Sequence, residues 1–84
     1  MAAEPARLVV WSREGCGLCE EMIHALAAWL AGRGLTAVVR DVDADPVARR
    51  RFGLRLPVLT LDGEVVCHGR LDPVELERLL RAGR

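Results

Sequence analysis

The chain has 84 residues, 51% of them hydrophobic, which is enough for one small domain with a modest core, so we expect a single domain over residues 1–84. Its 12 basic residues, all arginine, balance 12 acidic residues, and the formal net charge of zero provides no overall field that favours nucleic acid or an anionic membrane. No apolar run approaches the roughly 18 residues of a membrane span, and residues 1–5 lack the features of a signal peptide, so we expect a cytoplasmic protein without nucleic-acid or membrane partners.

The first half of the chain predicts a strand, a helix and a second strand. After a lead-in over residues 1–6, the unbroken apolar run Leu8–Trp11 predicts a buried strand. Apolar residues at helical spacing predict a helix over about Gly17–Ala31, ended by the glycine-rich turn at residues 32–34. Leu35–Val42 predicts the second strand. A strand–helix–strand unit of this length forms a right-handed parallel pair.

Two further helices are indicated by their capping residues. Asp45 and Pro46 have the residue types of an N-cap and a first helical position, which predicts a short helix through Phe52. Asp72 is likewise followed by a proline, and Glu75 lies three residues on, which is an Asp version of the capping box. A final helix is therefore expected to begin just after Asp72.

A hairpin is expected between these two helices. Residues 57–61 and 64–68 are apolar runs that flank Asp62-Gly63, a strong two-residue turn signal. Counting outward from the turn places Val58 opposite Cys67. We interpret Cys67 as a small buried thiol, and a second resolving or regulatory cysteine is the alternative. Parallel strands followed by an antiparallel hairpin predict an α/β fold with a four-stranded mixed sheet.

The pair Cys16 and Cys19 lies where the first strand passes into the first helix. Unpaired backbone N–H groups and the helix dipole favour an anion at that position, so we expect Cys16 to be exposed and to have a lowered pKa. Cys19 lies one turn inside the helix and can reach Cys16 without movement of the chain. Glu20 and Glu21 support the helix start but repel a thiolate. This geometry predicts a nucleophile with a resolving partner.

Other functions remain open for the same residues. The pair could hold zinc or an iron–sulfur cluster shared between two chains, or could belong to a non-catalytic binding module. His24 and His68 are candidate further ligands, but their spacing from the pair is not that of a standard zinc finger, and we assign no metal ligand. Arg13 is expected either to contact the thiolate or substrate, or to be a solvated loop residue.

Two motifs within this order of elements carry a resemblance. Residues 11–19, Trp-Ser-Arg-Glu-Gly-Cys-Gly-Leu-Cys, are similar to the glutaredoxin segment aromatic-Ser-Lys-x-x-Cys-Pro-Tyr-Cys. Residues 52–59, Phe-Gly-Leu-Arg-Leu-Pro-Val-Leu, are similar to the segment around the cis-proline of thioredoxins and glutaredoxins. The chain thus resembles the thioredoxin superfamily in its minimal glutaredoxin form, and in particular small bacterial glutaredoxin-like proteins. The resemblance implies helices on both faces of the sheet.

The resemblance also implies an activity and a substrate site. The activity is thiol–disulfide oxidoreduction, with a redox-active disulfide between the two cysteines of the motif. The Leu56-Pro57 bond would be cis, with the Leu56 backbone exposed to pair with a bound peptide or glutathione. Gly69 and Asp72 partly match the Gly-Gly-x-Asp that holds the glutamyl end of glutathione in glutaredoxins, with Arg70 in place of the second glycine.

The same resemblance implies the partners. Disulfide-containing proteins or glutathione would be the substrates, and a reductant that the sequence does not identify would return the electrons. Glutathione would serve as a co-substrate rather than as a tightly bound cofactor, and we expect a monomer. Arg49–Arg51 is expected to be the solvated face of a short helix, and holding the glycine carboxylate of glutathione is the alternative.

Overall fold

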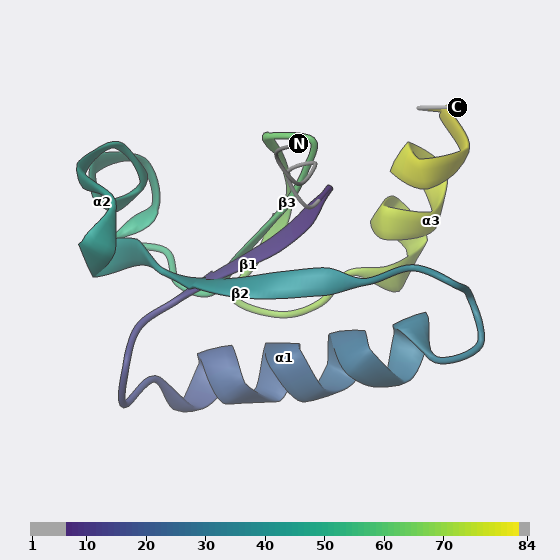
Figure 1. Cartoon of the computed structure of the whole chain (residues 1–84), viewed down its shortest axis with the longest axis horizontal. Coiled ribbons are helices and arrows are strands. Elements are labelled where there is room, and N and C mark those ends of the chain that lie inside the picture. The colour runs from purple at the N-terminus through teal and green to yellow at the C-terminus, as the bar shows by residue number, and fades with distance from the viewer. Residues whose placement is uncertain (1–6, 83–84) are drawn as a thin grey trace, which may run out of the picture.

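The computed structural model describes residues 7–82, so the expected lead-in over residues 1–6 lies outside the described part of the chain. Seven helices and strands and one 3₁₀ turn follow one another within it (Figure 1). They are β1 (Leu8–Ser12), α1 (Gly17–Leu30), β2 (Ala37–Asp41), η1 (Val42–Ala44), α2 (Pro46–Phe52), β3 (Val58–Leu61), β4 (Glu64–His68) and α3 (Pro73–Ala82). No helix of the described residues is long and apolar enough to cross a membrane.

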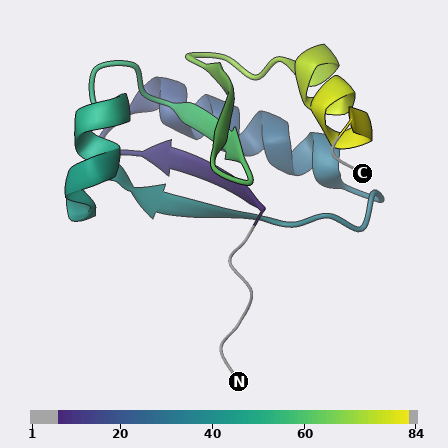
Figure 2. The ribbon, with the colours of Figure 1, turned by 90° about the horizontal axis from the view of Figure 1, so that it is seen from above.

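The four strands form one mixed sheet in the order β2-β1-β3-β4. Strands β1 and β2 run parallel, with Ser12 opposite Asp41, and Figure 2 shows both arrowheads pointing the same way, towards α2. Strand β3 is antiparallel to β1, with Trp11 opposite Val58, and β4 is antiparallel to β3. The predicted mixed α/β fold is confirmed. The carboxyl ends of β1, β2 and β4 therefore meet the start of β3 at one end of the sheet.

Both faces of the sheet are covered by helices, as Figure 1 shows for α1 on one side and α2 on the other. The larger apolar cluster joins the sheet to α1 and α3. Its buried members are Leu8, Val10, Met22, Leu26, Leu59, Leu61, Val66 and Leu76. The smaller cluster joins the sheet to η1 and α2, and its buried members are Val42, Ala48, Phe52 and Val58. Alternate residues of β1 and β3 thus point into different clusters, as the pleat of a strand requires.

The register of the hairpin differs from the sequence-based expectation. The Asp62-Gly63 turn forms as predicted, and both residues have the positive φ angles, 52° and 86°, that this hairpin turn demands. A β-bulge between the pairs made by Leu59 and Thr60 shifts the register, so that Cys67 lies opposite Leu59. The predicted pairing of Val58 with Cys67 is wrong, because simple counting assumes an unbroken ladder and a bulge sets two residues against one.

Two local predictions also need correction at helix starts. The second strand ends at Asp41 rather than Val42, because the Asp41 side chain accepts a hydrogen bond from the backbone N–H of Asp43 at 2.9 Å and begins η1. Asp72 caps α3 as expected, accepting from the backbone N–H of Glu75 at 3.1 Å. The second half of the predicted capping box does not form. The carboxylate of Glu75 accepts two hydrogen bonds from Arg78 instead.

Candidate functional site

Segments that are distant in sequence meet at the end of the sheet where β1 stops. The parallel register places Ser12, the last residue of β1, beside Asp41 of β2. The antiparallel register places Val58 beside the residue before Ser12, so Pro57 lies next to the point where the cysteine loop leaves the sheet. The backbone N–H of Gly69, which follows β4, donates to the carbonyl of Pro57 at 2.8 Å. This end of the sheet therefore collects the cysteine loop, the proline and Gly69.

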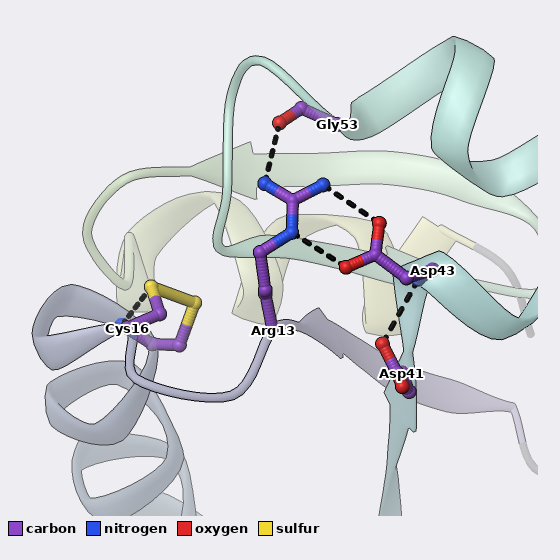
Figure 3. Close-up of polar contacts among 6 residues, drawn as sticks. Arg13, Cys16, Asp41, Asp43 and Gly53 are labelled. Carbon is purple, nitrogen blue, oxygen red and sulfur yellow. Dashed lines mark hydrogen bonds and ion pairs between the residues drawn. A yellow bond between two sulfur atoms is a disulfide. The ribbon is translucent and has the colours of Figure 1, made fainter.

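Cys16 and Cys19 are joined by a disulfide across the first turn of α1, with their Cα atoms 5.2 Å apart (Figure 3). Cys16 is the N-cap residue of α1, and its Sγ accepts a hydrogen bond from the backbone N–H of Cys19 at 3.1 Å. The prediction that the second cysteine can reach the first is confirmed. Cys16 is half-buried, less open than expected, and Cys19 is completely buried at 0% exposure.

This geometry gives the two sulfurs different chemistry. The N–H group that points at the Cys16 sulfur, together with the positive end of the α1 dipole, would stabilise a negative charge there after reduction. An incoming thiol or disulfide can approach Cys16, whereas the sulfur of Cys19 is shielded by the protein. Exchange with an external partner must therefore pass through Cys16.

Arg13 is held by an acidic residue of the neighbouring segment. Its Nε and one terminal nitrogen donate to the two carboxylate oxygens of Asp43 at 2.7 and 2.9 Å, and its other terminal nitrogen donates to the carbonyl of Gly53 at 3.3 Å. Figure 3 shows the guanidinium turned towards these partners and away from the disulfide. The hydrogen bonds from Arg13 hold the pKa of the Asp43 carboxyl below its ordinary value. Arg13 thus lies in the cysteine loop, but its guanidinium contacts Asp43 and Gly53 rather than the disulfide.

The Leu56-Pro57 peptide bond is cis, as the resemblance implies. Pro57 is buried and Leu56 is half-buried. Across residues 7–82, the Leu56 backbone takes part in no backbone hydrogen bond.

Gly69 and Arg70 line a cleft of about 210 Å³ between the β4–α3 loop and the side of α1 that carries Met22. The carboxylate of Asp72 accepts a hydrogen bond from the backbone N–H of Glu75 in the first turn of α3, so this group caps the helix. Arg70 is exposed to solvent. The two positions expected to bind glutathione, Gly69 and Asp72, therefore lie at or next to a cleft, and Asp72 also caps α3.

Cys67 is the free cysteine of the described residues, and it is half-buried against the α1–α3 side of the core. Burial raises the pKa of the Cys67 thiol, and a hydrogen bond with the Asp72 backbone offsets this only in part. A protonated thiol is a poor nucleophile. Cys67 is consequently less reactive than an ordinary exposed cysteine.

Two residues of this region were not singled out from the sequence. Asp43 was missed as the partner of Arg13, although an acidic residue just after a parallel strand is brought to the same sheet end as the loop after the neighbouring strand. Gly53 was noted as part of the segment that is similar to the region around the cis-proline. A Cβ atom there would lie 2.6 Å from the carbonyl oxygen of Arg49, so the close approach requires glycine. No group of three or more His, Cys, Asp or Glu side chains suited to a metal ion occurs within residues 7–82.

The fold and the disulfide at the start of α1 define the chain as a thioredoxin-like domain of the glutaredoxin form. The holo form of glutaredoxin C1 from Populus tremula x tremuloides has the same fold, with a TM-score of 0.56 and 22% identity over 94% of this chain and 87% of that one. The family model for the glutaredoxin-like domain (DUF836) matches residues 7–81. The chain therefore belongs to this glutaredoxin-like family.

Two relatives are more similar in sequence. The solution NMR structure of protein Ne2328 from Nitrosomonas europaea shares 34% identity and a TM-score of 0.75, covering 93% of this chain and 94% of that one. An uncharacterised protein of Mycobacterium tuberculosis is 34% identical over 76 residues, which is 84% of this chain and 74% of the relative. The glutaredoxin-like fold thus extends over nearly all of this chain.

Proposed function

We propose that the protein is a thiol–disulfide oxidoreductase that reduces disulfides of proteins or mixed disulfides with glutathione. The observation that carries the proposal is the disulfide between an N-cap Cys16 and a fully buried Cys19. One sulfur is at a site that stabilises a thiolate, and the other is held in place to attack it. Membership of the glutaredoxin-like family supports the same activity.

The reaction begins from the reduced pair. The Cys16 thiolate attacks one sulfur of the substrate disulfide, so that a new bond forms between Cys16 and the substrate. The second substrate sulfur leaves as a thiolate and takes up a proton. Cys19 then loses its proton and attacks the Cys16 sulfur, which releases the first substrate sulfur as a thiol. Two electrons have passed from the protein to the substrate, and the Cys16–Cys19 disulfide has formed.

We assign substrate binding to the groups around the cysteine loop. The unpaired backbone of Leu56 would receive an extended peptide or glutathione as an added strand, next to Pro57. Gly69 and Asp72, beside the cleft against α1, would contact the end of glutathione remote from its sulfur. Glutathione, a thioredoxin reductase or another thiol protein of the cytoplasm would return two electrons to the disulfide, with no tightly bound cofactor.

The Cys19→Ser variant tests this sequence of steps. Without the second sulfur, the mixed disulfide at Cys16 cannot be resolved from within the protein. We expect the reduced variant, incubated with glutathione disulfide, to gain the mass of one glutathione in an intact-mass measurement. Peptide mapping should place the adduct on Cys16.

Cys16→Ser is the matched control and should gain no adduct at Cys19, because that position is fully buried. An adduct found only on Cys67, or equal labelling of the two variants, would contradict the roles proposed for the pair.

A further inference from the structure

Arg13 joins three segments of the site through one guanidinium group. It belongs to the cysteine loop, and its backbone carbonyl accepts the N–H of Cys16 at 3.2 Å, so it begins the turn that places the nucleophile. Its side chain binds both oxygens of Asp43, in η1, and the carbonyl of Gly53, in the loop that leads to the cis-proline. A two-pronged arginine–carboxylate contact fixes orientation as well as charge.

Asp43 is itself held in place. Its backbone N–H donates to the Asp41 carboxylate at 2.9 Å, which fixes the first turn of η1. Both members of the Arg13–Asp43 pair have side chains 40% exposed, so the contact is not forced by burial. A loop arginine two residues before Gly15 could otherwise reach towards the sulfur of Cys16, since a long flexible side chain has many rotamers. The carboxylate instead holds the guanidinium turned towards Asp43 and Gly53 and away from the disulfide (Figure 3).

We propose that Asp43 is a positioning residue that holds the Arg13 guanidinium away from Cys16 and so limits the reactivity of the reduced pair. The inference rests on the proposed function for its biological meaning, but it concerns the nucleophile itself. A cation within about 4–6 Å favours a thiolate, and a cation paired with a carboxylate does so far less. The helix start, rather than a neighbouring charge, then remains the main support for the thiolate.

Other charged groups lie near the Arg13–Asp43 pair, and their effects on Cys16 must be distinguished from the effect of the pair. Asp41 contributes to the electrostatic field at Arg13, and Arg49 contributes to the field at Asp43. Glu14 lies in the cysteine loop, and Glu20 in the first turn of α1. Because Arg13 lowers the pKa of Asp43, that carboxylate stays ionised throughout the range in which a cysteine titrates. Both members of the Arg13–Asp43 pair are therefore charged over the pH range in which Cys16 reacts.

The test measures the alkylation rate of reduced Cys16 against pH in four variants. Asp43→Asn frees Arg13, and we expect alkylation at pH 6 to become about threefold to tenfold faster, with the midpoint of the profile at lower pH. Asp41→Asn removes one negative charge from the same segment and leaves Arg13 bound to Asp43, so its effect should be much smaller. Arg13→Gln alone and together with Asp43→Asn completes a double-mutant cycle.

The cycle separates release of the cation from a change in net charge. If the inference holds, Asp43→Asn accelerates alkylation only while Arg13 is present, and the double variant behaves like Arg13→Gln. Equal acceleration by Asp43→Asn and Asp41→Asn, or acceleration that persists without Arg13, overturns it. Loss of the proposed function would show separately, as absence of disulfide reduction by the parent protein, because alkylation needs no substrate disulfide.

Discussion

Replacing Cys16 with serine is expected to lower the rate of disulfide reduction about a thousandfold or more, because a hydroxyl is not ionised near neutral pH and is a weak nucleophile. The sulfur is the one reactive atom of the pair that an external partner can approach, since Cys19 is completely buried. The effect is measured as the rate at which the protein releases thiol from a small disulfide such as glutathione disulfide.

Cys67→Ser is the matched control for this prediction. It also removes one sulfur, but from a half-buried position on β4 whose thiol pKa is raised by burial. We expect its rate to stay within about twofold of the parent protein, because Cys67 is not bonded to the reacting pair and serine is close to cysteine in size. If Cys16→Ser kept most of its activity, or if Cys67→Ser lost it, the nucleophile would have to be assigned to Cys67 rather than Cys16.

Replacing Leu59 with alanine is expected to lower the free energy of unfolding by about 3 kcal/mol, within the usual range for a buried leucine. Leu59 is 0% exposed in the middle of β3 and belongs to the larger apolar cluster. Small domains are stable by only about 5–15 kcal/mol, so this loss is a large part of the total. Urea denaturation of the oxidised protein provides the measurement.

Leu54→Ala removes the same atoms from a side chain that is 102% exposed, in the loop between α2 and β3. Its free energy of unfolding should remain within about 0.5 kcal/mol of the parent protein. If the two variants were equally stable, the burial of Leu59 between the sheet and the helices α1 and α3 would be incorrect.

Local sequence signals were sufficient for most of the fold. Apolar runs, helical spacing and the Asp62-Gly63 turn set the order of strands and helices, since each depends on neighbouring residues alone. The position of Cys16 at the start of α1 followed in the same way, because a strand and an amphipathic helix border it directly. The cis bond before Pro57 was expected from family resemblance, and the structure agrees.

Contacts between distant segments could not be predicted in this way. The β-bulge that places Cys67 opposite Leu59 leaves no signature in an apolar run. Pairing of Arg13 with Asp43 spans 30 positions and depends on the parallel register of β1 and β2. The sequence places an arginine near the cysteines, but only the tertiary structure shows which carboxylate forms an ion pair with it.

The most direct test of the account compares the alkylation rates of Cys16 and Cys67 against pH within the same reduced protein. The rate of each cysteine rises with pH until its thiol is ionised, so the midpoint of each profile reports its pKa. We predict a midpoint for Cys16 below the ordinary thiol value of about 8.5, and one for Cys67 above it, because burial raises the Cys67 pKa. Profiles that coincide, or a Cys16 midpoint at or above the ordinary value, would contradict a thiolate stabilised at the start of α1.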